Sequence, residues 1–234
     1  MKHIIFTSLL TLAAVLTSSA AEPTRYELNI GDFTELKVIE GLNVDYYCNS
    51  DSAGKAVFTT TPDLASVLMF SNSKGKLEMQ ISTDGIDYDD LPTIKVYSNF
   101  LTYVENSGDS TVRVITVAGT PQFKAKLIGN GRLAVRDIHA ASLGASLSTG
   151  NGTLVISGKC DRAKLGMTGS GTVQADDLKA GRVKCTLLGT GSVGCWPTDN
   201  LTIVGATSGK VYYRGDPAVI KNTSIGIKAV KIDE

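Results

Sequence analysis

The chain has 234 residues, of which 42% are hydrophobic and 20% are charged, and its 23 basic side chains balance 23 acidic ones. This hydrophobic content is enough to bury a core, which argues against a disordered protein. The lack of a basic excess argues against a nucleic-acid-binding protein. Because the sequence contains two histidines, His3 and His139, neither histidine-based catalysis nor zinc binding is expected.

Residues 1–21 have the three-part order of a secretory signal peptide. A short basic start precedes an apolar run at residues 4–16, and small residues that suit a cleavage site follow. The apolar run is shorter than the ~20 residues that a membrane-spanning helix needs. We therefore expect residues 22–234 to form a single exported domain that is not embedded in a membrane. Its location would be the periplasm, the outer-membrane surface or the extracellular medium.

The first half of the mature chain is predicted to be a less regular β region, because it is rich in Val, Ile, Tyr and Thr. One helical turn is expected at residues 62–65 and a chain reversal at 71–75. The predicted strands are residues 26–30, 36–39, 42–48, 55–60, 76–81, 93–97 and 111–117.

An acidic loop at residues 84–92 interrupts these strands. It carries Asp84, Asp87, Asp89 and Asp90, and carboxylates are ligands that calcium prefers. Its glycine does not fit the spacing of an EF-hand loop. We therefore expect a solvated acidic loop and no bound metal ion.

The second half of the chain repeats a motif in which two glycines flank one polar residue. The second glycines are Gly131, Gly152, Gly171 and Gly191, with a weaker copy at Gly209. Successive copies are 18–21 residues apart, so residues 123–220 form regular repeats of about 20 residues. Such glycines suit a corner at which the backbone turns sharply with a positive φ.

Apolar residues alternate on both sides of each glycine turn, as they do in strands with one buried face. A unit of this length cannot bury its apolar face alone, so successive units must stack. If each unit makes one coil, Leu133, Leu154, Val173 and Val193 become neighbours along the axis. The sequence therefore predicts an all-β fold, a parallel β-helix. An antiparallel sandwich, which Asn-Gly turns also favour, is the alternative.

Residues 33–44 (FTELKVIEGLNV), residues 75–79 (GKLEM) and the repeated Gly-Asn-Gly or Gly-Ser-Gly turns together resemble the head GIN domain family. The resemblance extends over about residues 33–213, and the family is described as autotransporter adhesins that are common in Bacteroidota. It implies a right-handed β-helical fold and an adhesion role at the cell surface or in the periplasm. It brings no catalytic residues.

Four cysteines, at positions 48, 160, 185 and 195, lie in this exported context. An even number permits disulfides, and four cysteines allow three pairings. The alternation places Cys160, Cys185 and Cys195 facing inward, where they would act as small apolar fillers. A structural disulfide is the alternative.

Two glycine motifs suggest nucleotide binding at first sight. Residues 189–194 match Gly-x-Gly-x-x-Gly, and residues 205–210 resemble a phosphate-binding loop. Pro197 stands where a dinucleotide site requires a helix, and Val211 replaces the hydroxyl residue that would bind magnesium. Both segments are copies of the repeat, so no cofactor is expected.

The stacked coils would carry a ladder of positive charge. Lys124, Lys164 and Lys184 occupy equivalent outward positions, with Gly144 in the remaining place, and Arg162 and Arg182 form a second column beside them. Like charges opposite one another destabilise a strand pair. Such a ladder is either balanced by nearby acidic residues or retained for an anionic partner. The hypothesis is that these five cations bind an anionic glycan or envelope polymer, and the alternative is that the long lysines simply extend into solvent.

The sequence therefore predicts an exported, non-enzymatic module for adhesion or envelope binding. One alternative is a carbohydrate-active enzyme that uses carboxylates near a shared corner, namely Asp137, Asp161, Asp176 and Asp177. Another is a structural protein that polymerises end to end through unpaired terminal strands, with residues 221–234 as a cap at one end.

Overall fold

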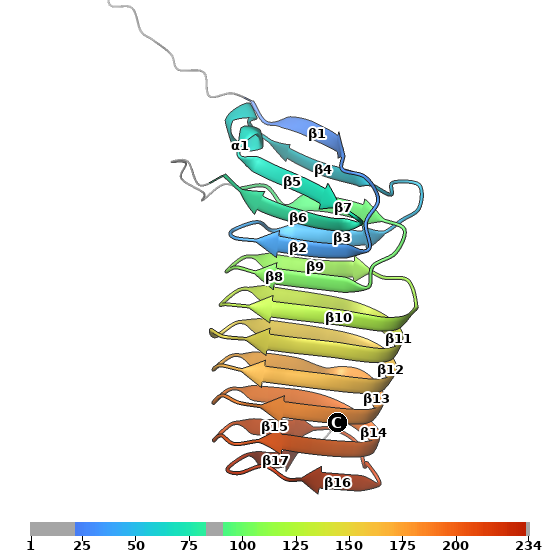
Figure 1. Ribbon diagram of the computed structural model, residues 1–234, viewed down its shortest axis with the longest axis vertical. Coiled ribbons are helices and arrows are strands. Elements are labelled where there is room, and N and C mark those ends of the chain that lie inside the picture. Colours follow the sequence, from blue (N-terminus) through green and yellow to red (C-terminus); the bar gives the residue numbers. More distant parts are fainter. Residues whose placement is uncertain (1–21, 83–90, 233–234) are drawn as a thin grey trace, which may run out of the picture.

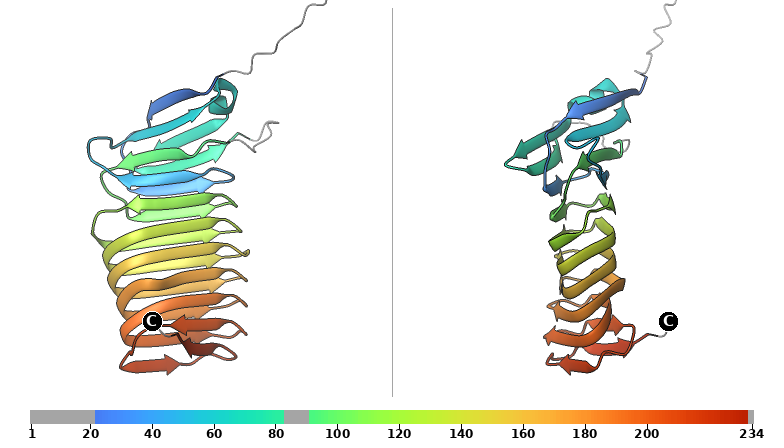
Figure 2. Two further views of the ribbon diagram at one scale, coloured as in Figure 1. Left: turned by 180° about the vertical axis from the view of Figure 1, so that it is seen from behind. Right: turned by 90° about the vertical axis from the view of Figure 1, so that its right-hand side faces the viewer.

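The computed structural model describes residues 22–82 and 91–232. In this part of the chain the backbone winds into a right-handed β-solenoid (Figure 1), which confirms the predicted β-helix over the antiparallel sandwich. Each coil is flattened, so that two sheets face one another across a narrow core (Figure 2). The predicted signal peptide and the acidic loop residues Asp84, Asp87, Asp89 and Asp90 lie outside the described residues.

We name the two sheets front and back, as they lie in Figure 1. In spatial order the front sheet contains β6, β2, β8, β10, the second halves of β11 to β14, and β16. The back sheet contains β7, β3, β9, the first halves of β11 to β14, β15 and β17. The strands are β1 (Thr24–Asn29), β2 (Glu35–Ile39), β3 (Val44–Cys48), β4 (Lys55–Thr60), β5 (Leu68–Ser73), β6 (Lys76–Ile81), β7 (Ile94–Ser98), β8 (Tyr103–Ser107), β9 (Thr111–Thr116), β10 (Thr120–Ile128), β11 (Arg132–Ser148), β12 (Thr153–Thr168), β13 (Thr172–Leu187), β14 (Ser192–Gly205), β15 (Lys210–Tyr213), β16 (Val219–Asn222) and β17 (Lys228–Lys231).

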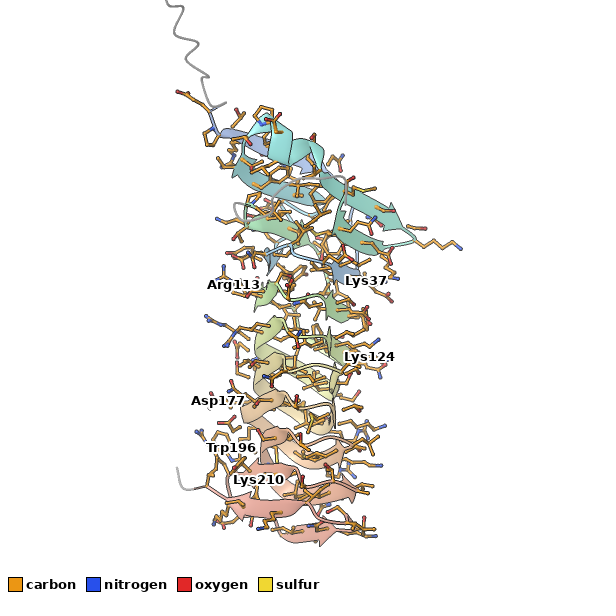
Figure 3. All side chains as sticks on the ribbon, turned by 90° about the vertical axis from the view of Figure 1, so that its left-hand side faces the viewer. Lys37, Arg113, Lys124, Asp177, Trp196 and Lys210 are labelled. Atoms are coloured by element: carbon orange, nitrogen blue, oxygen red, sulfur yellow. The ribbon has the colours of Figure 1, made fainter. Side chains whose placement is uncertain are left out.

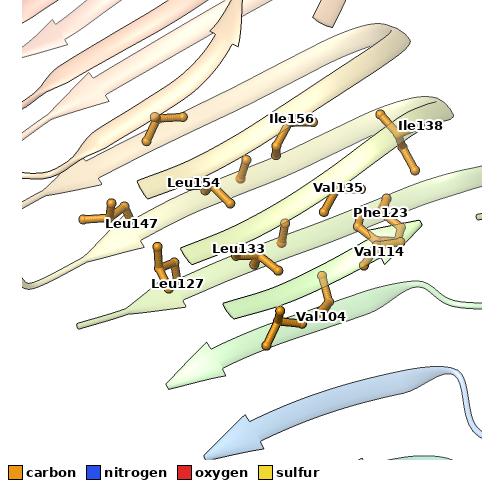
Figure 4. Close-up of a cluster of buried hydrophobic side chains, with 14 of the residues drawn as sticks. Val104, Val114, Phe123, Leu127, Leu133, Val135, Ile138, Leu147, Leu154 and Ile156 are labelled. Carbon is orange, nitrogen blue, oxygen red and sulfur yellow. The ribbon is translucent and has the colours of Figure 1, made fainter. Parts of the chain in front are cut away.

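The repeat register predicted from the glycine spacing is confirmed. Leu133 pairs with Leu154, Leu154 with Val173, and Val173 with Val193, each one coil further along the axis. All four side chains are fully buried, and Figure 4 shows part of this core between the sheets. Full burial of such side chains stabilises the fold by about 1.5–3 kcal/mol each.

The glycine turns join the two sheets along one edge, and the two glycines of a turn serve different purposes. Gly129, Gly150 and Gly169, the first glycines of three turns, have φ of +100°, +68° and +140°. Gly152, a second glycine, has no left-handed φ, so the expected positive φ is wrong for this position. It is needed because a Cβ there would lie 2.8 Å from the carbonyl oxygens of Gly129 and Gly131. The second glycines therefore allow successive coils to approach closely.

The N-terminal region does not stack in chain order. The coil made by β2 and β3 lies between the coil of β6 and β7 and the coil of β8 and β9. Beyond β6 and β7, strands β1, β4 and β5 pair in antiparallel fashion. Helix α1 (Pro62–Ser66) confirms the predicted helical turn, whereas β5 and β8 are strands that the sequence pattern does not predict. The antiparallel strands close this end of the solenoid.

At the C-terminal end, residues of the predicted cap, 221–234, form part of the last coil. Residues 221–222 complete β16, and β17 forms the other half of the last coil. Each strand pairs with one neighbour within the described ranges, and Ile220 and Ile225 are 45% and 77% exposed. Lys228 and Lys231 lie on β17, where positive charge discourages pairing of strand edges between molecules.

The cysteines are free thiols, so the structure contains no disulfide at the four positions. Cys160, Cys185 and Cys195 are buried, as the alternation predicts, and Cys48 is half-buried. Burial raises the pKa of the Cys160 thiol to about 11, with a smaller contribution from the charge of Asp161. These three cysteines act as apolar fillers between the sheets.

Candidate functional site

A row of cations lies on the outer surface of the front sheet. Lys124 pairs in register with Gly144, Gly144 with Lys164, and Lys164 with Lys184. These lysines are exposed, and Figure 3 shows Lys124 projecting from the same flank as Lys37. The structure therefore brings the predicted lysines into one column that is interrupted by a glycine.

A second cationic column runs beside the first. Arg162 lies directly opposite Arg182 on the neighbouring strand, and both side chains are exposed. Adjacent strands are about 4.8 Å apart, so Arg162 and Arg182, like Lys164 and Lys184, leave the sheet surface about that far from one another.

The two columns are not neutralised by neighbouring acidic residues. Among residues 22–82 and 91–232, the ion pairs do not involve Lys124, Lys164, Lys184, Arg162 or Arg182. Other cations on the described strands do have acidic partners, at 2.6–3.4 Å for several of them. The predicted site residues are therefore available to an external anion.

The surface of the front sheet is concave beside the lysine column. A depression of about 400 Å³ lies over β10, β11, β12 and β13, at the places where Gly144 and Gly166 have no side chain. Lys124, Lys164 and Lys184 stand around it, and the backbone of the two glycines forms its floor.

Tyr103 and Lys126 also line the depression and are held in place by Glu105. The Tyr103 hydroxyl donates a hydrogen bond to the Glu105 carboxylate, Ser107 donates another at 2.7 Å, and Lys126 Nζ lies 3.4 Å from it. Burial alone would raise the pKa of Glu105. The hydrogen bonds from Tyr103 and Ser107 and the charge of Lys126 outweigh burial and hold that pKa below its usual value. Glu105 therefore remains ionised and fixes one wall of the depression.

Sequence reasoning misses Tyr103, Lys126 and Gly166 as parts of this site. Gly166 lies in the column beside the lysines, where Ser146 precedes it and Thr186 follows it. Alignment of the repeats by outward position, and not only by their glycine turns, would have found this second gap.

The aspartates considered for catalysis do not form one cluster. Asp176 and Asp177 share the guanidinium group of Arg214, at 3.6 and 3.1 Å. Asp137 lies beside a histidine, and Asp161 is exposed at the start of the front sheet. Figure 3 shows Asp177 on the flank opposite the lysine column. Within the described residues, no three or more His, Cys, Asp or Glu side chains are grouped so that they could hold a metal ion.

The family model described as "Putative auto-transporter adhesin, head GIN domain" matches residues 32–217. The chain belongs to the head GIN domain family. The matched range agrees with the extent of the resemblance inferred from the sequence, and the head GIN region contains every cation of the two columns.

Several solved structures share the fold of this head GIN chain. A "putative adhesin" from Bacteroides fragilis has a TM-score of 0.82 and 17% identity, covering 91% of this chain and 97% of its own. A "putative adhesin" from Parabacteroides merdae has a TM-score of 0.67 and 20% identity, with coverages of 91% and 97%. A "putative lipid binding protein" from Parabacteroides distasonis has a TM-score of 0.67 and 21% identity, with coverages of 89% and 97%. At these identities the likeness shows the fold alone.

No curated protein matches the head GIN chain. Within the described residues, none of the helical structure is long and apolar enough to span a bilayer.

Proposed function

We propose that this chain is an exported, non-enzymatic adhesion module that binds an anionic glycan or envelope polymer through the cations of the front sheet. The observation that carries the proposal is the stacking of Lys164 on Lys184 and of Arg162 on Arg182, with none of the four cations in an ion pair in the described part of the chain. Repulsion between like charges across a strand pair destabilises the free protein. An anionic partner would relieve that repulsion when it binds.

The arrangement suits a polymer better than a single small ion. The cations follow one another along the solenoid axis at the spacing of the coils, about 4.8 Å, or at twice that spacing across the gap at Gly144. Each exposed charge pair in water contributes little, about 0–1 kcal/mol. A polymer that lies along the axis would engage several cations at once, and display of many copies would multiply weak contacts.

Two other observations support the export and binding parts of the proposal. Residues 1–21 have the order of a secretory signal peptide. The family and two of the solved neighbours are described as adhesins. The proposal places the protein in the periplasm, on the outer-membrane surface or outside the cell.

The test is binding of the mature chain to polygalacturonate, a carboxylated polysaccharide, with neutral dextran as the comparison. The variant Lys164→Glu/Lys184→Glu should lose at least tenfold in affinity, and binding to polygalacturonate should weaken as salt is added. The matched control is Lys210→Glu/Lys228→Glu, which changes the same charge on two exposed lysines that also face one another on adjacent coils, but on the back sheet. Equal losses in both variants, or no loss in either, would overturn the proposal.

A further inference from the structure

Two glycines in the middle of the front strands are not required by the fold. Gly144 and Gly166 have no left-handed φ. A Cβ on Gly144 would lie 3.7 Å from Lys124 Cγ, and one on Gly166 would lie 3.5 Å from Ser146 Cβ, which are ordinary contacts. Glycine weakens the interior of a strand, and at such a position it often marks the close approach of a ligand or another backbone.

These two glycines create the depression in the cationic surface. Gly144 lies between Lys124 and Lys164 in the lysine column. Gly166 lies one strand further along and two residues closer to the turn, in the next outward column. A side chain at either position would occupy the depression, so the fold carries a gap that it does not itself need.

We propose that the depression binds one sugar unit of a carboxylated polysaccharide, a hexuronate. Its ring lies on the floor formed by Gly144 and Gly166, and its carboxylate lies between the ammonium groups of Lys124 and Lys164. This inference rests on the proposed function and adds to it a location and a class of sugar. The volume of about 400 Å³ falls within the range of small-ligand sites, about 300–1,000 Å³.

The walls suit both parts of such a sugar. The methylene stems of the lysines and the glycine backbone offer apolar surface to the C–H face of a sugar ring. Tyr103 closes one end with an aromatic ring, which Glu105 fixes through its hydrogen bond with the hydroxyl. Lys124 and Lys164 have no acidic partner in the described part of the chain, so a carboxylate placed between them would meet two unpaired charges.

The experiment measures binding of trigalacturonate, and of its methyl ester, by calorimetry. The double variant Gly144→Val/Gly166→Thr fills the depression without changing any charge, and Gly144→Ser is a milder second variant. The control Ser148→Val adds bulk on the same strand, at an outward position outside the depression. Far-UV circular dichroism verifies that each variant is folded.

Wild type should bind trigalacturonate at least tenfold more tightly than its methyl ester. Both glycine variants should weaken binding, the double variant by at least tenfold, while Ser148→Val should bind like wild type. If the glycine variants bind normally and Lys164→Glu/Lys184→Glu does not, the sugar site is wrong and the proposed cationic surface stands. If neither set changes binding, both fail. Equal binding of the ester would also overturn the hexuronate assignment.

Discussion

Replacement of Gly152 by alanine should destabilise the solenoid, although the change adds a single methyl group. The new Cβ would lie 2.8 Å from the carbonyl oxygens of Gly129 and Gly131 and 2.9 Å from Leu127 Cδ2. Ordinary contact begins at 3.4 Å, so the two coils must separate locally by about 0.6 Å. No left-handed φ is involved, so the effect is purely one of close approach.

The magnitude follows from the bonds that hold these coils together. The Gly152 amide donates to the Gly129 oxygen at 3.1 Å, and the Thr153 amide donates to the Gly131 oxygen at 3.0 Å. If both N···O distances grow by about 0.6 Å, both hydrogen bonds are lost. Each such bond contributes about 1 kcal/mol. Overpacking costs about 1–3 kcal/mol more, and the stiffer unfolded chain of alanine offsets about 0.4–1 kcal/mol. The expected net loss is about 2–4.6 kcal/mol of unfolding free energy.

The matched control is Gly144→Ala, the same chemical change in β11, the strand that precedes the turn of Gly152. Its Cβ would meet Lys124 Cγ at 3.7 Å, so this variant should gain about 0.4–1 kcal/mol. Guanidinium unfolding followed by far-UV circular dichroism measures both. If Gly152→Ala is as stable as Gly144→Ala, close approach is not the reason for glycine in the turns.

Three other predictions test local features. In the native protein a maleimide should label half-buried Cys48 and spare Cys160, whose buried thiol has a pKa raised to about 11. After denaturation all four cysteines should react. Rapid labelling of more than one thiol in the native protein would contradict the packing. Glu105→Gln should lower stability at neutral pH, because the folded pKa of Glu105 is depressed and its contribution exists above its unfolded pKa. The difference from wild type, measured as Tm, should shrink as the pH falls below about 4.3, and a pH-independent difference would refute this. Asp45→Ala should lower the free energy of unfolding in urea by about 1–3 kcal/mol, because it removes a buried carboxylate to which Arg113 Nε and Nη2 donate hydrogen bonds at 2.6 and 2.7 Å. An unchanged free energy would show that this pair is dispensable.

The regular half of the fold follows from the sequence because its contacts are local in the repeat. The glycine spacing alone sets Leu133 opposite Leu154, since each coil must bring its turn back to the same edge. The N-terminal half has no such marker. β8 escapes prediction because Asn106 occupies a buried position in it and the carboxylate of Glu105 is buried as well, which breaks the apolar alternation.

The candidate site is predictable to a similar extent. Equivalent positions in the repeats place Lys164 opposite Lys184 and expose the gap at Gly144. The contact between Lys126 and Glu105 crosses from β10 to β8, a strand that the pattern does not reveal. The depression depends on two adjacent columns at once, so it becomes visible only when the coils are seen side by side.

The out-of-order N-terminal coil has a consequence for how the molecule is made. β2 and β3 acquire their partners on both sides only after β9 has been synthesised, and the hydrogen bond from the Thr111 amide to the Asn43 side chain joins residues 68 positions apart. Closing so long a loop is slow compared with adding a coil of about 20 residues. We therefore expect the pairing of β2 and β3 with β8 and β9 to be the slow first step of folding. The remaining coils can then add to this end one at a time.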